Sequence, residues 1–224
     1  MWWLTGVFMA CAESGAMDSL TDESTSESVG SVSVNHFEQQ GLHTDIFEAA
    51  LYAYEKAVLA DLTESPVYTV VDLRMHSKQK RLWTVNVQTG ELLFHEVTTH
   101  GRGSDSDHNG YLDSVSNTPN SKKSSVGLYK TAEVYNGKHG RSLRLDGLEE
   151  GFNDNARDRA IVIHGADYAG DAFVQKYGKA GRSLGCPAVS NDVSDDLITT
   201  IKEGSLLFVY ANDEKWLNES TYLP

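Results

Sequence analysis

Short apolar runs separated by turn residues recur along the chain between residues 67 and 210. The runs are rich in Val, Ile, Leu, Phe and Tyr, which are typical of strands. Thr89-Gly90 separates two of them, as the turn of a β-hairpin would. A chain with this pattern is constrained to form a sheet with only a few helices. We therefore predict an α+β fold that is mainly β with packed helices, and we find no internal repeat.

The strands are expected where the apolar runs lie, over residues 67–75, 81–88, 91–99, 126–135, 142–148, 160–164 and 205–210. A polar segment rich in Gly, Asp, Asn and Ser lies between two of these strands, at residues 101–125. A loop of this length in a compact domain is usually functional or disordered.

A helix is expected over residues 45–62, because apolar residues recur there at helical spacing and Pro66 follows. Asp45 and Glu48 resemble a capping box, in which two side chains satisfy the free N–H groups of the first helical turn. Shorter helices are expected over residues 171–177 and 191–203.

The first 41 residues differ in composition from the rest of the chain. Residues 1–11 form an apolar run as long as a signal-peptide hydrophobic region, and the Phe-Met-Ala-Cys that ends at Cys11 resembles a bacterial lipobox, where the cysteine is lipidated. An ordinary signal peptide and a plain apolar terminus are the alternatives. Residues 12–41 are rich in Ser, Asp and Glu, so we expect a disordered acidic tether there, followed by a folded domain at 42–224.

The 224 residues carry a formal net charge of −13. This charge argues against binding to nucleic acids or to anionic membranes, because phosphate contacts need clustered Lys and Arg. The chain has no His-x-x-x-His or Cys-x-x-Cys pair, so a zinc site is not expected.

Cys186 and His164 are the strongest candidates for chemistry. His164 ends the β-branched run 161–163, where a strand would hold its imidazole rigidly, and Cys186 follows Gly185 in a turn. A neighbouring imidazole activates a thiol by taking its proton and stabilising the thiolate, which lowers the thiol pKa. The turn would also leave backbone N–H groups free to bind an oxyanion. A structural cysteine and an ordinary turn histidine are the alternatives.

The motifs around these two residues resemble the L,D-transpeptidase catalytic-domain (YkuD-type) family of peptidoglycan enzymes. That family carries His-Gly and, further along, Ser/Thr-x-Gly-Cys; this chain has His164-Gly165 and then Ser-Leu-Gly-Cys at 183–186. The upstream Ser-Ser-Val-Gly-Leu-Tyr at 124–129 is similar to another family motif. The similarity runs from residue 45 to residue 211 and is greatest to a divergent murein L,D-transpeptidase subgroup.

The resemblance implies an L,D-transpeptidase-like β-sandwich or barrel that acts on peptidoglycan stem peptides without a metal or other cofactor. It implies that Cys186 is the nucleophile, which forms a thioester, and that His164 is the general base. The backbone N–H groups of Gly185 and Cys186 are expected to bind the oxyanion, and Ser183 to support the histidine. Transfer of the acyl group to an amine would cross-link or remodel the cell wall.

The resemblance also implies a set of substrate-binding residues, which two departures alter. Leu184 and Ala188 replace polar residues that most family members carry. The stem-peptide carboxylate must then be bound by another group, and Arg102, Arg157 or Arg182 is expected to pair with it. The residues that we expect to bind substrate are Arg182, His100, Arg102, Ser125, Tyr129 and Gly165.

Two other functions remain open beside transpeptidation. Transfer of the acyl group to water would make the chain an L,D-carboxypeptidase. The missing polar group at Ala188 is also compatible with a catalytically weak peptidoglycan-binding lipoprotein. Each of these functions predicts an exported protein of the periplasm or cell envelope, attached to a membrane if Cys11 is lipidated, with no nucleic-acid partner.

Overall fold

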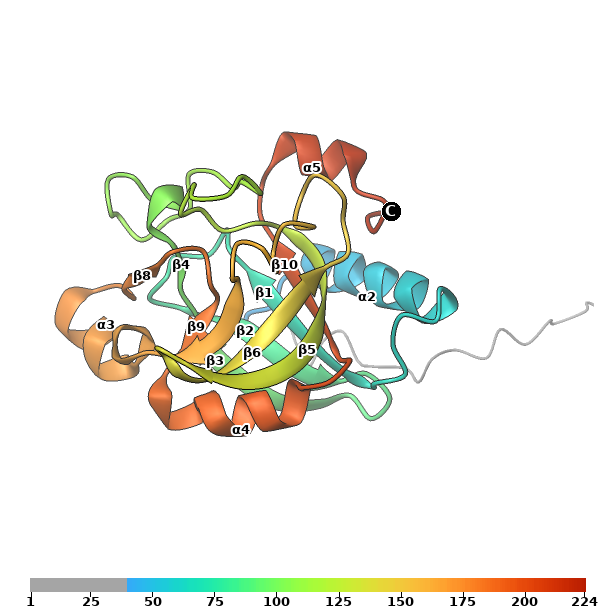
Figure 1. Ribbon diagram of the computed structural model, residues 1–224, viewed down its shortest axis with the longest axis horizontal. Coiled ribbons are helices and arrows are strands. Elements are labelled where there is room, and N and C mark those ends of the chain that lie inside the picture. The colour runs from blue at the N-terminus through green and yellow to red at the C-terminus, as the bar shows by residue number, and fades with distance from the viewer. Residues whose placement is uncertain (1–39) are drawn as a thin grey trace, which may run out of the picture.

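The computed structural model describes residues 40–224 (Figure 1). The expectations for the apolar segment 1–11 and for the tether as far as residue 39 lie outside the described residues. The helices are α2 (Thr44–Leu59), α3 (Asp171–Tyr177), α4 (Asn191–Ile201) and α5 (Glu214–Glu219), with the 3-10 turns η1 (Arg102–Ser104) and η2 (Asp167–Ala169). The strands are β1 (Val67–Asp72), β2 (Lys80–Asn86), β3 (Glu91–Val97), β4 (His100–Gly101), β5 (Gly127–Gly137), β6 (Gly140–Gly147), β7 (Val162–Gly165), β8 (Arg182–Ser183), β9 (Ala188–Val189) and β10 (Leu206–Tyr210).

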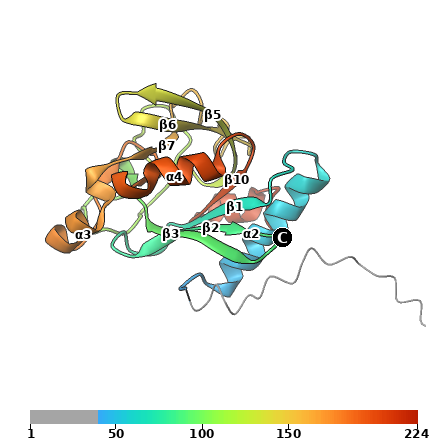
Figure 2. The same cartoon turned by 90° about the horizontal axis from the view of Figure 1, so that it is seen from below.

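One large sheet holds eight strands in the order β3-β2-β1-β10-β5-β6-β7-β9, and β4 pairs with β8 separately. Neighbours in the large sheet are antiparallel except for the β1–β10 and β7–β9 pairs, which are parallel. The sheet curls strongly, towards a barrel, with the helices packed around it (Figures 1 and 2). This confirms the predicted α+β fold that is mainly β.

Strands β1 and β10 lie at the centre of the sheet, and nearly all of their residues are buried. A strand that is buried on both faces needs cover on both sides. Helix α2 packs against β1 and β10, and α4 packs against β1, β6 and β7. Figure 2 shows the two helices on opposite sides of β1. The enclosed apolar side chains form one core. None of the helices within residues 40–224 has the length and apolar character needed to span a membrane.

Each strand predicted from an apolar run is present, although several ends differ, and α3 spans the predicted residues. The sequence does not predict β4, β8 and β9, because strands of two residues are too short to show alternation. The polar segment 101–125 is tied down by hydrogen bonds. Gly103 N–H donates to the Lys122 carbonyl at 2.8 Å, and Ser124 N–H donates to Ser104 Oγ at 3.0 Å.

The predicted capping box at the start of α2 is wrong. The residue before the helix is His43, and its side chain makes no capping hydrogen bond. Asp45 lies inside the first turn, where it accepts a hydrogen bond from Arg74 Nη1 at 3.0 Å. Arg74 also binds Asp72, the last residue of β1, at 2.9 Å. The Asp45 carboxylate, which the sequence pattern predicts to cap the helix, instead forms a tertiary ion pair with Arg74.

Glu149 joins three separate parts of the fold through one buried carboxylate. Its oxygens accept hydrogen bonds from Leu128 N–H at 2.6 Å, Trp216 Nε1–H at 2.9 Å and Ser220 Oγ–H at 2.6 Å. The residue is 3% exposed. Buried donors such as these cost free energy if they lose their acceptor. Glu149 thus fixes the C-terminal helix α5 against the start of β5.

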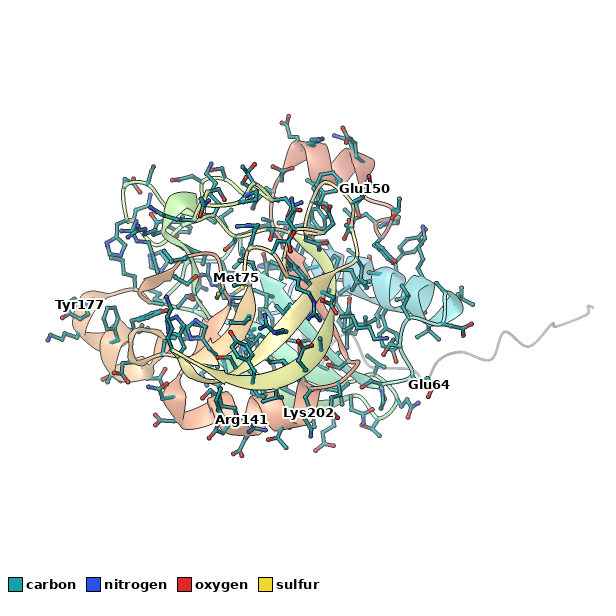
Figure 3. All side chains as sticks on the ribbon, in the orientation of Figure 1. Glu64, Met75, Arg141, Glu150, Tyr177 and Lys202 are labelled. Carbon is teal, nitrogen blue, oxygen red and sulfur yellow. The ribbon has the colours of Figure 1, made fainter. Side chains whose placement is uncertain are left out.

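Substitution of Glu149 by Gln is expected to destabilise the chain by about 1–3 kcal/mol. The three donors bond to two carboxylate oxygens in Glu149, whereas the glutamine amide offers only one acceptor oxygen. Urea unfolding measures the change. Glu150→Gln is the matched control, since Glu150 is exposed and its side chain lies on the surface (Figure 3). Equal stability of the two variants would show that the Glu149 carboxylate does not hold these elements together.

Candidate active site

Strand pairing brings Cys186 and His164 to the same cavity. His164 lies in β7 opposite Ala188 of the parallel strand β9, and Cys186 lies in the turn just before β9. Both residues line a cavity of about 400 Å³. The turn Gly137-Lys138-His139 between β5 and β6 forms another part of its wall. The two residues that the sequence analysis singles out thus share one pocket.

The Cys186 thiol is partly buried and faces the backbone that leads into β7. It donates a hydrogen bond to the Ala160 carbonyl at 3.6 Å. Burial raises the pKa of the thiol above its ordinary value, against lowering contributions from the Val162 N–H, Arg159 and Lys138. The expectation of a lowered thiol pKa is therefore wrong, because removal of the thiolate from water outweighs the groups that favour it.

His164 is 1% exposed and has a defined tautomer. Its Nδ1 lies 2.8 Å from the Gly165 carbonyl oxygen, and because a carbonyl only accepts, Nδ1 carries the hydrogen. Burial lowers the pKa of His164, and the Gly165 carbonyl opposes this while His139 and Lys138 add to it. The neutral ring thus keeps a lone pair on Nε2. No hydrogen bond joins this ring to the Cys186 sulfur in the described part of the chain.

The ring of His139 stacks on that of His164. Their centroids are 4.3 Å apart and their planes differ by 20°. His139 lies at the tip of the β5–β6 hairpin, remote in sequence from His164. A sequence pattern does not reveal this contact, because only the curl of the sheet brings the hairpin over the cavity.

Ser183 shapes the turn before the cysteine. Its hydroxyl donates to the Cys186 carbonyl at 2.7 Å and accepts the Gly185 N–H at 3.0 Å. Ser183 therefore stabilises the loop that carries Cys186 and does not support His164 as expected. The Gly185 N–H is also engaged and is not free for an oxyanion, whereas the Cys186 N–H has no acceptor among residues 40–224.

Thr99 fixes the backbone on the other side of Cys186. Its hydroxyl donates to the Cys186 carbonyl at 3.2 Å and accepts the Ala188 N–H at 3.1 Å. Its own N–H donates to the Ala188 carbonyl at 3.0 Å. Thr99 therefore holds both ends of the Cys186–Ala188 segment, a role that its place at the end of a predicted strand does not reveal.

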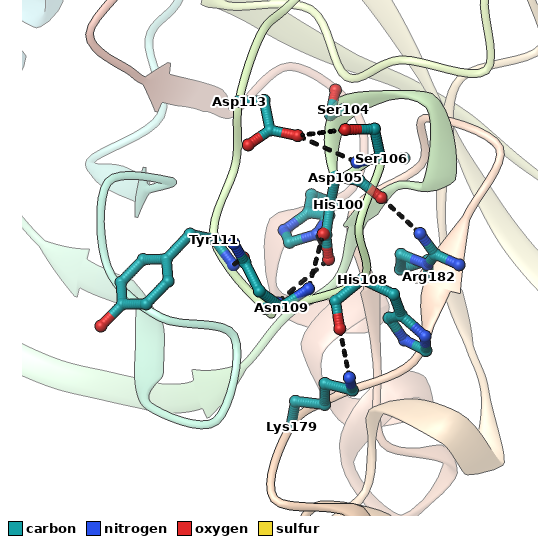
Figure 4. A network of polar contacts seen from close by, with 12 residues as sticks. His100, Ser104, Asp105, Ser106, His108, Asn109, Tyr111, Asp113, Lys179 and Arg182 are labelled. Atoms are coloured by element: carbon teal, nitrogen blue, oxygen red, sulfur yellow. Dashed lines mark hydrogen bonds and ion pairs between the residues drawn. The ribbon is translucent and has the colours of Figure 1, made fainter.

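His100 does not line the cavity, contrary to expectation. It is buried, with Arg81 Nη2 2.9 Å from its Nδ1. Asp105 Oδ2 lies 3.2 Å from its Nε2 (Figure 4). Burial and the Arg81 charge lower the pKa of His100 to about 4. The neutral ring joins β4 to the following loop, and Arg182 Nη1 donates to the Asp105 carbonyl. The network therefore positions β8, which leads to Cys186, and its buried His100 ring lies outside the cavity lining.

Three more expected substrate contacts have structural roles. Tyr129 is buried and donates to the buried Ser125 Oγ at 2.8 Å, so neither is available to a ligand. Gly165 lies against α4, where an added Cβ would stand 2.6 Å from Ser194 Oγ. The glycine thus allows close packing of β7 on the helix.

The arginines expected to bind a carboxylate divide into two groups. Arg102 and Arg182 line the cavity. Arg157 does not, because it pairs with Glu133 and Asp146. The structure adds Arg159, which the sequence analysis does not select and which also lines the cavity.

Three carboxylates outside this cavity come close enough to hold a metal ion. Asp105, Asp107 and Asp113 have oxygens within 4.8 Å of one another. Loop hydrogen bonds already use these oxygens, including one from Ser106 N–H to Asp113 at 2.9 Å (Figure 4). A second groove of about 820 Å³ includes Arg74 and Tyr111 in its lining but neither Cys186 nor His164.

The family model of the L,D-transpeptidase catalytic domain matches residues 38–210. An L,D-transpeptidase structure from Mycobacterium smegmatis is similar, with 14% identity over 66% of this chain and 59% of that chain and a TM-score of 0.41. An L,D-transpeptidase structure from Stackebrandtia nassauensis is 15% identical over 74% of this chain and 68% of that chain, with a TM-score of 0.38. The structure of Bd1075 from Bdellovibrio bacteriovorus is 17% identical over 66% of this chain and 50% of that chain, with a TM-score of 0.41. No curated protein matches the chain.

The environment of the sulfur predicts a thiol that ionises late. In the ligand-free chain, the pH midpoint of iodoacetamide labelling at Cys186 is expected above the ordinary thiol pKa of about 8.5, because burial disfavours the thiolate. Peptide mapping follows Cys186 separately from Cys11. A midpoint below the ordinary value would mean that the thiol is already activated without a ligand.

Proposed function

The chain belongs to the L,D-transpeptidase catalytic domain family, and on this premise we propose that it is a peptidoglycan L,D-transpeptidase that acts through a thioester on Cys186. The observation that carries the proposal is the shared cavity, in which a thiol and a neutral imidazole with a free Nε2 lie within the same walls. These are the nucleophile and the base that acyl transfer needs.

The first step forms the acyl-enzyme. His164 Nε2 takes the proton of the Cys186 thiol, and the sulfur attacks the carbonyl carbon of the diaminopimelate residue in a stem peptide. The C–N bond to the terminal D-alanine breaks, and the leaving amine takes the proton back from the imidazolium. The Cys186 N–H is the backbone donor that we assign to the oxyanion, because it has no acceptor among the described residues.

The second step releases the acyl group. An acceptor amine attacks the thioester carbonyl, the C–S bond breaks, and His164 carries the proton from the amine to the sulfur. Water as the acceptor gives a shortened peptide, which is the L,D-carboxypeptidase alternative. Both outcomes use the same acyl-enzyme and differ only in the acceptor.

Arg102 and Arg182 are our candidates for binding the donor carboxylates. Both line the cavity, and neither forms an ion pair with another described residue. Arg182 Nη1 donates to the Asp105 carbonyl, which leaves its other N–H groups for a ligand. A guanidinium group offers two parallel N–H donors to a carboxylate. This arrangement supplies the anchoring group that Ala188 cannot supply.

The protein is proposed to act in the periplasm or cell envelope, where its substrate lies, and to be held at a membrane through a lipidated Cys11. Cys11→Ser should then move the protein from the membrane fraction to the soluble fraction. Cys186→Ser is the matched control, because it removes the other cysteine and should leave the protein at the membrane. Retention of the Cys11 variant would exclude this anchor.

Intact-mass spectrometry with a tetrapeptide donor tests the proposed chemistry. The wild-type chain should gain the mass of the donor less D-alanine, and Cys186→Ala should gain none. His164→Ala should acylate about 10²–10⁴-fold more slowly, the usual contribution of a general base. His43→Ala is the control for loss of a histidine, since His43 is exposed and does not line the cavity.

The same experiment separates the alternative functions. A cross-linked product after addition of an amine acceptor supports the transpeptidase, and a shortened peptide alone supports the carboxypeptidase. Binding to isolated sacculi without an adduct on Cys186 would replace both with a peptidoglycan-binding role.

A further inference from the structure

The walls of the Cys186 cavity carry positive charge that no carboxylate neutralises. Arg102, Lys138, Arg159 and Arg182 line it, and no Asp or Glu does. Within residues 40–224 none of these cations takes part in an ion pair. The chain as a whole has a net charge of −13, so this local excess is opposite to the overall balance. A site of this kind stabilises negative charge that enters it or develops in it.

Arg159 differs from the other cations in the cavity because four hydrogen bonds hold its guanidinium group, two of them to backbone carbonyls. Its Nη1 donates to the Ser116 carbonyl at 2.8 Å and to Ser125 Oγ at 3.1 Å. Its Nη2 donates to the Lys123 carbonyl at 2.5 Å and to Ser121 Oγ at 3.4 Å. An arginine has five N–H donors, so only the one on Nε remains. Such a guanidinium cannot clamp a carboxylate through two parallel bonds, but its charge has a definite position.

That position is against the cysteine loop. A Cβ built on Gly185 would lie 3.4 Å from Arg159 Nη2, so the guanidinium group lies close to the residue that precedes Cys186. The residue after Arg159 is Ala160, whose carbonyl accepts the thiol hydrogen bond. One short segment therefore carries both the thiol acceptor and the cation.

We propose that Arg159 is the fixed cation that stabilises the Cys186 thiolate, a positioning residue for the reactive sulfur and not a substrate ligand. The inference rests on the proposed function, because the thiolate forms only when His164 takes the thiol proton. The Arg159 charge then replaces part of the hydration that burial removes, and it does so before any substrate charge is present.

The electrostatic relation between the two residues is mutual. Although burial raises the pKa of Cys186, the charge of Arg159 lowers it. Burial likewise lowers the pKa of Arg159, while the charge of Cys186 raises it. The other titratable or charged residues that line the cavity with the sulfur are Arg102, Tyr135, Lys138, His139, His164, Tyr168 and Arg182.

The test is the pH midpoint of Cys186 alkylation in the full chain, followed by peptide mapping. Arg159→Gln is expected to raise the midpoint by about one pH unit, which is a tenfold smaller thiolate fraction at neutral pH. Arg159→Lys keeps the positive charge and should shift the pH midpoint by less than half as much. Arg157→Gln is the matched control. It removes the same charge from an arginine that lies two residues before Arg159 and outside the cavity, so it should leave the midpoint unchanged.

The midpoint is a better measure than the rate at one pH, because a thiolate of higher pKa is also intrinsically more nucleophilic. Equal midpoints for Arg159→Gln, Arg157→Gln and the wild type would overturn the proposal. The outcome does not depend on turnover, so it is distinct from failure of the donor to acylate Cys186.

A measurement on the unmodified chain covers the case in which the Arg159 variants do not fold. Anionic iodoacetate and neutral iodoacetamide are compared at Cys186 and at free cysteine. A fixed cation beside the sulfur should raise the rate ratio of iodoacetate to iodoacetamide above that of free cysteine. Equal ratios would show that no net positive charge acts at the sulfur and would overturn the proposal.

Discussion

Desolvation of the reactive pair is the constraint on which the site depends. Burial raises the pKa of the Cys186 thiol and lowers the pKa of the His164 imidazole, so both groups favour their neutral forms. A neutral imidazole is a base, and a neutral thiol resists oxidation better than a thiolate. The same burial makes charge separation costly. A proton therefore moves from sulfur to nitrogen only if nearby groups stabilise the thiolate, which is the role that we assign to Arg159.

Strand pairing fixes the geometry in which this transfer is proposed to occur. The parallel β7–β9 pair places His164 opposite Ala188, and Thr99 binds the backbone at both Cys186 and Ala188. Gly165 then permits close approach of α4 to β7. The reactive loop is thus held by hydrogen bonds from Thr99 to its backbone and by packing, rather than by the imidazole itself. This explains how the cavity keeps its form although no hydrogen bond joins His164 to Cys186 among the described residues.

The sequence predicts features that depend on local pattern. Apolar runs locate the long strands, and Cys186 and His164 fall in one cavity as their residue types suggest. It does not predict roles that depend on burial or on distant partners. His100 resembles an active-site histidine until Arg81 and Asp105 are seen to enclose it. Arg157 and Arg159 look equivalent in sequence, yet one pairs with surface carboxylates and the other lines the cavity. Both residues lie in one turn, whose backbone directs the two side chains to different surroundings.

The most direct test of a neutral, base-competent His164 is nitrogen NMR of its ring in the ligand-free chain at neutral pH, assigned by comparison with His164→Gln. The structure predicts a protonated Nδ1, bonded to the Gly165 carbonyl, and an unprotonated Nε2. An imidazolium with both nitrogens protonated would instead reveal a preformed thiolate–imidazolium pair and would contradict the account.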